Sequence, residues 1–179
     1  MRLHGMNKDA WKRYTKEGSW FYNVVGAGFK YNTTDINAAL GLAQLDRLEW
    51  MRDKRAAIAK AYNEAFGNFP ELITPTVKPD RRTSWHLYVL KLNLEQLKID
   101  RNAFIQELSG RGIATSVHFI PVYRHKFYRD QFNLSIKDWP DSEWLYERIF
   151  SLPIFPGLTK AQVKHITSSV QEIIERHRK

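Results

Sequence analysis

The 179-residue sequence contains no cysteine. This absence excludes disulfide frameworks, thiolate zinc sites and cysteine nucleophiles, and it agrees with a reducing cytoplasm. No stretch approaches the roughly 20 apolar residues that a membrane helix requires, and the segment that begins at Met1 has no apolar core of a secretory signal. The sequence therefore predicts a cytoplasmic protein without a membrane partner.

Clusters of like charge are also absent, although the formal net charge is +9. The basic residues are dispersed and mixed with acids, as in Arg52–Arg55 and Glu172–Lys179. A nucleic-acid-binding protein usually gathers its basic residues on one face or arm, so we expect a solvated surface and no nucleic-acid partner. The six histidines lack the spacing of a zinc or iron site, which predicts no metal centre.

The apolar content is sufficient for a hydrophobic core, because 43% of the residues are hydrophobic and 13% are aromatic. A chain of this length forms one ordinary domain, or a small domain with a piece of another. Between Thr33 and Gly67, apolar residues recur at helical spacing behind a threonine cap and the first-turn acid Asp35. About 33 residues at about 1.5 Å each would span roughly 50 Å, so this helix is expected to link two bodies.

The remainder of the chain alternates between strand and helix patterns. The expected elements are a strand at 85–92, a helix at 100–111 capped by Asp100, a strand at 113–119, a short helix at 142–150, a short strand and turn at 151–157, and a last helix opened by Thr159. This order predicts an α+β or small α/β fold in which helices cover one face of a small sheet.

Several segments together resemble a known family. Gly28–Gly41 (GFKYNTTDINAALG), followed by Gln44–Leu45, resembles the signature that opens the long interdomain helix of the DegT/StrS family. The segments Arg2–Met6, Trp85–Tyr88, Arg111–Ile113 with His118–Tyr123, and Ser151–Pro156 match further landmarks in the family's order. Members of this family are pyridoxal-phosphate (PLP)-dependent sugar-nucleotide aminotransferases of fold type I, the aspartate aminotransferase class.

The resemblance implies a domain organisation. Residues 1–33 would be a remnant of the large cofactor domain with a substrate and interface loop, 34–67 the long interdomain helix, and 68–179 the C-terminal small α/β domain. The chain has about half the usual family length. The other half would carry the lysine that forms a Schiff base with PLP, and Lys8, Lys12 and Lys16 do not follow a strand as that lysine does. We therefore expect a C-terminal fragment without a catalytic residue, inactive alone.

The same resemblance supplies two cofactor-binding candidates, Lys30 and Asn32. In the family, active sites form at a dimer interface, and the loop that contains these positions reaches the partner's cofactor phosphate. Many members have asparagine at the first position and arginine at the second, so this chain departs from the common pattern. A lysine supplies a point charge, and an asparagine amide donates hydrogen bonds to phosphate or sugar hydroxyls. The alternative is a solvated loop lysine beside a residue that precedes the helix cap.

Substrate-binding candidates are Trp20, Tyr22, Tyr31, His118 and Tyr123. By resemblance, the aromatic loop of Trp20 and Tyr22 approaches the nucleotide-sugar pocket of the neighbouring chain, where rings stack on a base or sugar; dimer packing is the alternative. Tyr31 would border the pocket or pack before the helix. His118 would hydrogen-bond a sugar hydroxyl or phosphate, unless it is a satisfied histidine of the core edge. Tyr123 is its neighbour.

The expected function is thus part of a PLP-dependent aminotransferase. The parent enzyme would transfer an amino group, from glutamate, to a nucleotide-linked keto-sugar, and it would act as a homodimer with shared active sites. A non-catalytic dimerisation or interaction module is the alternative, and a basic nucleic-acid-binding protein is a weaker one.

Overall fold

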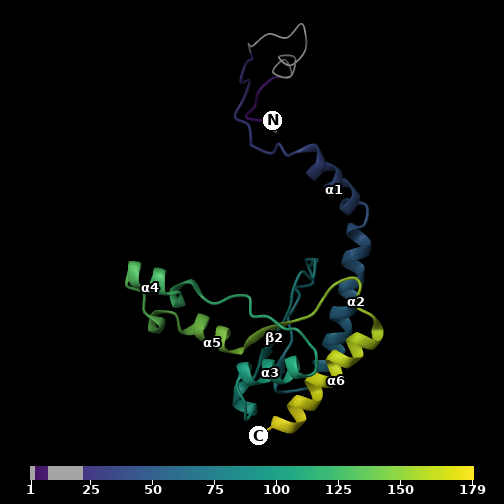
Figure 1. Ribbon diagram of the computed structural model, residues 1–179, viewed down its shortest axis with the longest axis vertical. Coiled ribbons are helices and arrows are strands. Elements are labelled where there is room, and N and C mark those ends of the chain that lie inside the picture. The colour runs from purple at the N-terminus through teal and green to yellow at the C-terminus, as the bar shows by residue number, and fades with distance from the viewer. Residues whose placement is uncertain (1–2, 8–21) are drawn as a thin grey trace. The chain divides into compact units, whose positions relative to one another are not determined.

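The computed structural model describes residues 3–7 and 22–179 (Figure 1). The chain divides into two units, one that ends at Leu48 and one from Glu49 to Lys179. The described residues form a mixed α/β structure with six α-helices and one three-stranded antiparallel sheet. No helix in this described part of the chain combines the length and the apolar character needed to cross a membrane.

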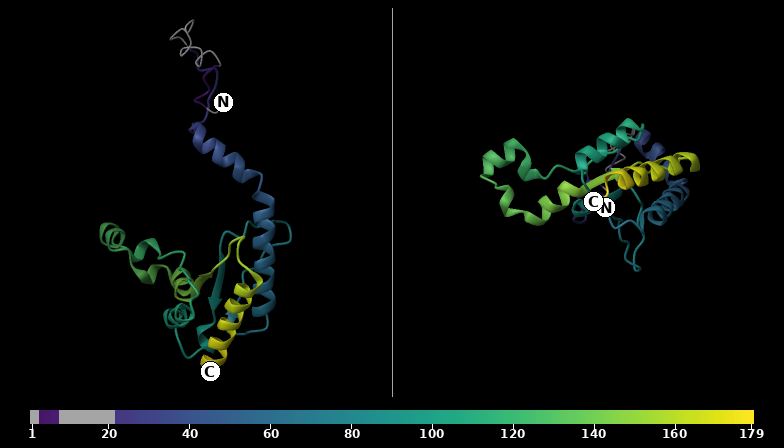
Figure 2. Two further views of the ribbon diagram at one scale, coloured as in Figure 1. Left: turned by 45° about the vertical axis from the view of Figure 1, so that its right-hand side comes forward. Right: turned by 90° about the horizontal axis from the view of Figure 1, so that it is seen from below.

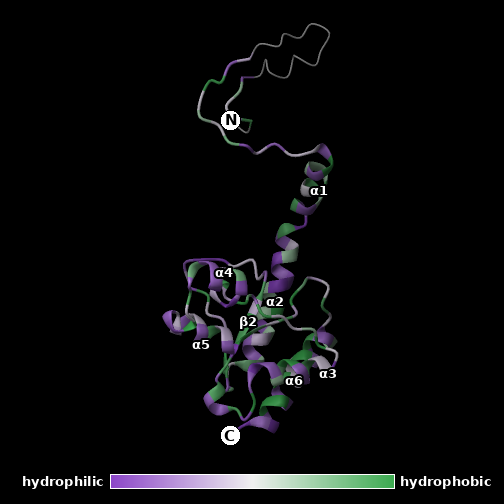
Figure 3. Ribbon diagram, turned by 60° about the vertical axis from the view of Figure 1, so that its left-hand side comes forward, coloured by the Kyte–Doolittle hydropathy of each residue, from purple (hydrophilic) through white to green (hydrophobic). Residues whose placement is uncertain are grey.

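The first unit contains helix α1 (Asp35–Leu45). Thr34 caps it, because its hydroxyl accepts a hydrogen bond from the amide of Asn37 at 3.3 Å, and Asp35 lies in the first turn. The predicted helix start is therefore confirmed. None of the residues of α1 is buried, although many of them are hydrophobic (Figure 3).

The expected helix over 34–67 is two helices, α1 and α2 (Leu48–Phe66). Asp46 and Arg47 form a turn between them, in which the Arg47 amide donates to the Gln44 carbonyl at 3.1 Å. This tighter hydrogen bond closes α1 before α2 begins. The amide of Gly67 donates to the Asn63 carbonyl at 2.9 Å, and α2 ends there, as predicted. The division into 1–33, 34–67 and 68–179 stays a prediction.

The second unit is built on a sheet in the order β1-β2-β3. Its strands are β1 (Leu72–Ile73), β2 (Tyr88–Leu92) and β3 (Ile149–Leu152). Along β2, Tyr88, Leu90 and Leu92 are buried, whereas Val89 and Lys91 are only partly buried. Alternate side chains of a strand point to opposite faces, so the face with Tyr88 is the core face.

Helices cover this core face. The remaining elements are η2 (Leu94–Gln96), α3 (Arg101–Gly110), η3 (Val122–Arg124), α4 (Lys126–Phe132), η4 (Ile136–Asp138), α5 (Pro140–Arg148) and α6 (Lys160–His177). Tyr62 of α2, Phe104 of α3 and Val170 of α6 are fully buried in one cluster with the core face of β2. Figures 1 and 2 show α2 and α6 on one side of β2 and α5 on the other.

Local capping fixes the helix ends as the sequence predicted. Asp100 accepts from the Ala103 amide at 2.8 Å at the start of α3. Thr159 and Gln162 form a reciprocal capping box at the start of α6. Past the end of α3, Gly112 adopts a positive φ of 75°, a conformation that favours glycine, and Ile113 then donates back to the Leu108 carbonyl at 3.0 Å.

The strand expected at 113–119 is absent, and this prediction is wrong. The segment pairs with β3 only through a bridge between Ser116 and Ser151. In one direction, Pro153 has no amide proton to continue the pairing. In the other, Arg101 Nη1 donates to the carbonyl oxygen of Ile149 at 3.1 Å and occupies that acceptor. Two local interactions therefore stop the ladder at one residue.

A buried ion pair ties the C-terminus to the sheet. The side chain of Glu71 is 1% exposed and accepts two hydrogen bonds from the half-exposed Arg178 guanidinium, one from Nη2 at 3.3 Å and a shorter one from Nε. Burial acts to raise the pKa of Glu71, but the hydrogen bonding and charge of Arg178 together with a backbone hydrogen bond outweigh it, and the pKa lies below its ordinary value. A carboxyl whose folded-state pKa is lowered stabilises the fold above its unfolded pKa, and this stabilisation is lost as the pH falls through the folded-state pKa.

We predict that Arg178→Ala lowers the free energy of unfolding at pH 7 by about 1–3 kcal/mol, because it leaves a buried carboxylate without its charged donor. Urea denaturation measures this loss. The difference from the parent chain should shrink as the pH falls through the folded-state pKa of Glu71. Arg176→Ala is the matched control, since Arg176 is 62% exposed beside Glu107 and its loss should cost under about 0.5 kcal/mol. Equal losses in the two variants would contradict the prediction.

Candidate functional site

The segment that carries the cofactor candidates is held by backbone pairing. Leu3 pairs with Lys30 and Met6 with Val24 as antiparallel bridges. The His4 amide donates to the Phe29 carbonyl, and the Val25 amide to the Gly5 carbonyl, each at 2.9 Å. This pairing fixes the backbone of Lys30 four residues ahead of Thr34, the cap of α1.

Two glycines make the pairing possible. A Cβ on Gly28 would lie 1.9 Å from the amide nitrogen of Gly5, and a Cβ on Gly5 would lie 1.9 Å from the Gly26 carbonyl oxygen. Gly5 also has a positive φ of 70°. Backbone therefore touches backbone here, which only glycine permits. The sequence offered Gly5 only as a family landmark, without this role.

Lys30 and Asn32 are both exposed. No carboxylate of the described residues forms an ion pair with Lys30. Between and beside them, Phe29 and Tyr31 stack with ring centroids 4.9 Å apart and planes 9° apart. Because alternate residues of an extended segment point to opposite sides, we expect Lys30 and Asn32 to point away from the side that carries this stack.

The structure describes two of the three aromatic residues that the sequence assigns to substrate binding in the first unit. Tyr31 is 68% exposed and Tyr22 is 42% exposed. Both rings are thus open to a ligand or to a second chain. Trp20 lies outside the described residues.

In the second unit, His118 lies against the face of the sheet opposite the core. Its Nδ1 is 2.9 Å from Oγ of Ser151, and Ser151 is 5% exposed on β3. The ring is partly buried and meets the Phe119 ring edge-on at 4.8 Å. Since Ser151 occupies Nδ1, the nitrogen left to meet a ligand is Nε2. No sequence pattern indicates this partner, which is 33 residues away.

Tyr123 is more buried than its sequence role suggested. It is 7% exposed, and its ring stacks on Trp139 with centroids 5.7 Å apart. Its buried hydroxyl makes no hydrogen bond within the described residues, and burial raises the pKa of Tyr123. A buried hydroxyl without a partner is uncommon and costs free energy; the nearest polar side chains that affect it are Ser142 and Glu143.

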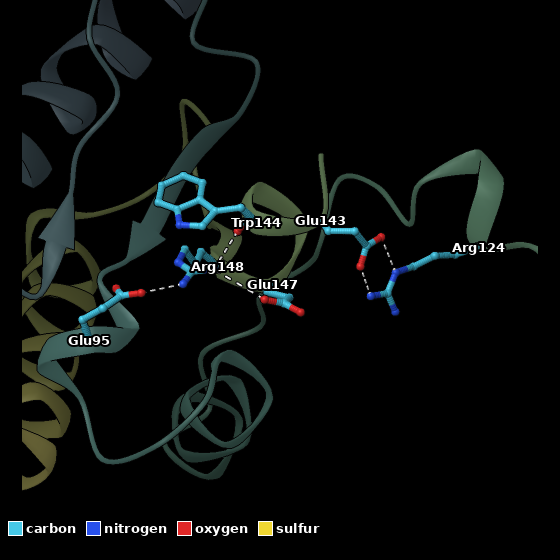
Figure 4. Close-up of polar contacts among 6 residues, drawn as sticks. All are labelled: Glu95, Arg124, Glu143, Trp144, Glu147 and Arg148. Atoms are coloured by element: carbon cyan, nitrogen blue, oxygen red, sulfur yellow. Dashed lines mark hydrogen bonds and ion pairs between the residues drawn. The ribbon is translucent and has the colours of Figure 1, made fainter. Parts of the chain in front are cut away.

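Ion pairs fix the segment around Tyr123 (Figure 4). The Arg124 guanidinium donates two hydrogen bonds to Glu143 of α5, from Nε at 2.8 Å and from Nη2 at a shorter distance. The bonds from Arg124 lower the pKa of Glu143. Arg148 Nη2 donates to Glu95 at 2.7 Å, and its guanidinium lies 4.7 Å from the Trp144 ring. These contacts hold η3 against α5 and α5 against η2.

The site candidates thus form two sets. Lys30, Asn32, Tyr31 and Tyr22 belong to the first unit, and His118 and Tyr123 belong to the second. Within the part of the chain that the structure describes, no three histidine or acidic side chains form a group that could hold a metal ion.

Comparisons with known proteins give consistent matches. The model of the DegT/DnrJ/EryC1/StrS aminotransferase family matches residues 1–171. Uncharacterized protein MJ1066 of Methanocaldococcus jannaschii is 49% identical over 178 residues, which are 99% of this chain and 46% of that protein. The spore coat polysaccharide biosynthesis protein SpsC of Bacillus subtilis is 43% identical over 176 residues, 98% of this chain and 45% of SpsC. The chain spans about half the length of these relatives.

Solved structures agree with the sequence matches. Spr1654 from Streptococcus pneumoniae in its pyridoxamine-phosphate (PMP) form is similar with a TM-score of 0.78 and 31% identity, over 98% of this chain and 43% of that one. Its PLP form gives a TM-score of 0.76 and 30% identity.

We predict that Ser151→Ala changes the tautomer ratio of His118, because Nδ1 loses its hydrogen-bond partner, and lowers the free energy of unfolding by about 0.5–1.5 kcal/mol. Nitrogen-15 NMR of the imidazole ring measures the tautomer ratio. Ser116→Ala is the matched control, since Ser116 meets β3 through its backbone and should leave the ring signals unchanged. Identical His118 signals in the parent and in Ser151→Ala would show that the bond does not orient the ring.

Proposed function

Because the chain belongs to the DegT/DnrJ/EryC1/StrS aminotransferase family, we propose that it is part of a cytoplasmic enzyme that transfers an amino group from glutamate to a nucleotide-linked keto-sugar. The observation that carries this proposal is the family match over residues 1–171, supported by the similarity to Spr1654 in its PLP and PMP forms. The name of SpsC supports polysaccharide biosynthesis as the setting.

The residues present fit a cofactor phosphate. Lys30 is an exposed cation without an ion pair among the described residues, Asn32 adds an amide donor, and α1 begins three residues beyond Asn32. The N-terminus of a helix carries partial positive charge and favours phosphate. In the proposed enzyme, Lys30 and Asn32 hold the phosphate of the partner subunit's PLP. When bound, PLP supplies an electron sink for the reaction.

The remaining candidates are assigned to the sugar nucleotide. His118, with its ring held by Ser151, presents Nε2 to a sugar hydroxyl or phosphate. Tyr123, which follows His118 on the same segment, is assigned to the same ligand. The exposed rings of Tyr22 and Tyr31 stack on the nucleobase or sugar, together with Trp20. No nucleic acid, membrane or metal takes part in this proposal.

The chain is proposed to be inactive alone. The sequence offers no candidate for the lysine that binds PLP covalently, and the chain covers less than half of the length of its curated relatives. Activity then requires the rest of a family chain and a homodimer whose active sites draw on both copies.

We predict that the isolated chain shows no stoichiometric absorbance change with PLP. A chimera in which these 179 residues replace the matched region of MJ1066 should bind PLP, and glutamate should convert the cofactor to PMP. Lys30→Ala in the chimera should weaken PLP binding about 10- to 100-fold, the effect of losing one charge-assisted hydrogen bond, and Lys30→Arg should retain most of the affinity.

Two results would contradict this reading. A strong absorbance change in the isolated chain that disappears when one lysine is replaced would show that the chain has its own cofactor lysine. Unchanged PLP affinity in the Lys30→Ala chimera would remove Lys30 from the phosphate site.

A second candidate function, a self-association module, is supported by the apolar surface of α1. Ile36, Leu40, Leu42 and Leu45 are each at least 61% exposed, and nothing in α1 is buried. Large apolar side chains left exposed on one helix mark interfaces, and a second copy is the commonest partner of such a surface.

We predict concentration-dependent self-association of the isolated chain, measured by sedimentation equilibrium. Ile36→Glu with Leu40→Glu should weaken it more than about tenfold, because two charges would enter an apolar interface. Asn37→Glu with Gln44→Glu adds two charges to the polar side of α1 and is the control for added charge. A parent chain that stays monomeric at high concentration would exclude this function for the fragment.

A further inference from the structure

An open groove lies between α2 and the start of α6, within the second unit. It encloses about 490 Å³. Ala57, Ala61 and Ala65 of α2 form one wall, and Leu158 and Val163 lie on the other. The three alanines are spaced by four residues, so they share one helix face. Small side chains in this row allow another backbone to approach α2 closely.

Fixed contacts hold the two walls of the groove. The Tyr62 hydroxyl donates to the carbonyl of Pro153 at 2.8 Å, just ahead of the Pro156–Leu158 edge. Gln171 Nε2 donates to the Ala65 carbonyl at 2.9 Å and joins α6 to α2, which run side by side in Figures 1 and 2. These contacts fix α2, α6 and the loop before α6 around the groove.

The rim of the groove is cationic. Lys54, Lys160 and Lys164 line it, and all three are exposed. The lysine ion pairs seen in the described residues are those of Lys60 with Glu64 and Lys126 with Asp130. None of the groove-lining side chains is acidic. The groove is apolar inside, along the alanine row, and its basic rim has no acidic partner within the described part of the chain. Such a groove complements a surface that is apolar in the middle and acidic at its edges.

We propose that this groove binds an amphipathic helix with acidic flanks, supplied by the portion of a DegT-family chain that lies outside the 179 residues. The proposal rests on the proposed function, because it names the family chain as the source. The match takes up 46% of MJ1066, so more than half of a relative's chain is available as a partner. A helix fits because its apolar stripe would lie along the alanine row and its acidic side chains would meet the three lysines.

A second copy of this chain complements the groove poorly. Two grooves facing each other would bring six lysines together, which electrostatic repulsion disfavours. Helix α1 carries exposed apolar residues, but its only acidic residue is Asp35 in the first turn. An acid-flanked helix from elsewhere is the better match.

The test is a titration of the intact 179-residue chain with the part of MJ1066 outside the match, in the absence of PLP, followed by calorimetry. We expect saturable binding that weakens as salt is added, because exposed lysines are screened. Ala61→Glu should weaken binding more than about 30-fold, since it places a charge on the apolar floor. Lys160→Glu with Lys164→Glu should weaken it about tenfold and remove most of its salt dependence.

Lys60→Glu is the matched control, because it reverses a lysine on α2 that does not line the groove; it should change affinity less than about twofold. Circular dichroism confirms that each variant is folded. If Ala61→Glu unfolds the chain, the exposed lysine pair still decides the question. Wild-type affinity in both groove variants would overturn the proposal. Loss of self-association in the same variants would also overturn it, because a second copy would then be the occupant of the groove.

The docking proposal and the proposed aminotransferase function can fail independently of each other. Groove-dependent binding without any glutamate-driven PMP formation in the MJ1066 chimera would leave the docking proposal intact and contradict the aminotransferase proposal. Normal PMP formation, together with unchanged binding affinity in both groove variants, would support the aminotransferase proposal and contradict the docking proposal.

Discussion

The packing of Tyr62 against Tyr88 is the contact on which the second unit depends. The two rings meet edge-on at 4.9 Å, and both residues are fully buried. The Tyr88 hydroxyl donates to Asn63 at 2.7 Å, and the Tyr62 hydroxyl donates to Pro153 at 2.8 Å. Burial raises the pKa of both residues, so both remain neutral donors. This one contact joins α2 to the central strand and to the end of β3.

Strand β3 pairs with β2 and is buried on both faces. Its core face carries Phe150 and Leu152, while Ser151 and Ile149 face the other side through their register with Val89 and Lys91. On that second side Ser151 holds His118, and at the edge of the strand the Ile149 carbonyl accepts from Arg101. A strand that is apolar on one face and hydrogen-bonded on the other lets a stable core orient the His118 ring for the proposed ligand contact.

Local chemistry was predictable from sequence, and contacts between distant residues were not. The caps Thr34, Asp100 and Thr159 follow from side chains bonding amides three residues away, and all three are confirmed. The predicted strand at 113–119 is wrong because β propensity does not reveal that Arg101 already occupies the Ile149 carbonyl. The Ser151 partner of His118 and the contact of Gly5 with Gly28 join residues far apart in sequence. The family was predictable because its landmarks are ordered along the chain, and the match over 1–171 confirms it.

The helix α1 links the folding of the first unit to assembly. It has 11 residues and no buried side chain, whereas isolated helices shorter than about 12–15 residues are marginal in water. Its cap contributes only about 1 kcal/mol, so burial of its apolar side chains by another surface is the remaining source of stability. The phosphate candidates Lys30 and Asn32 directly precede this helix. A surface that covers α1 would therefore also fix the loop that we propose to hold the phosphate, so that cofactor binding and assembly would stabilise each other.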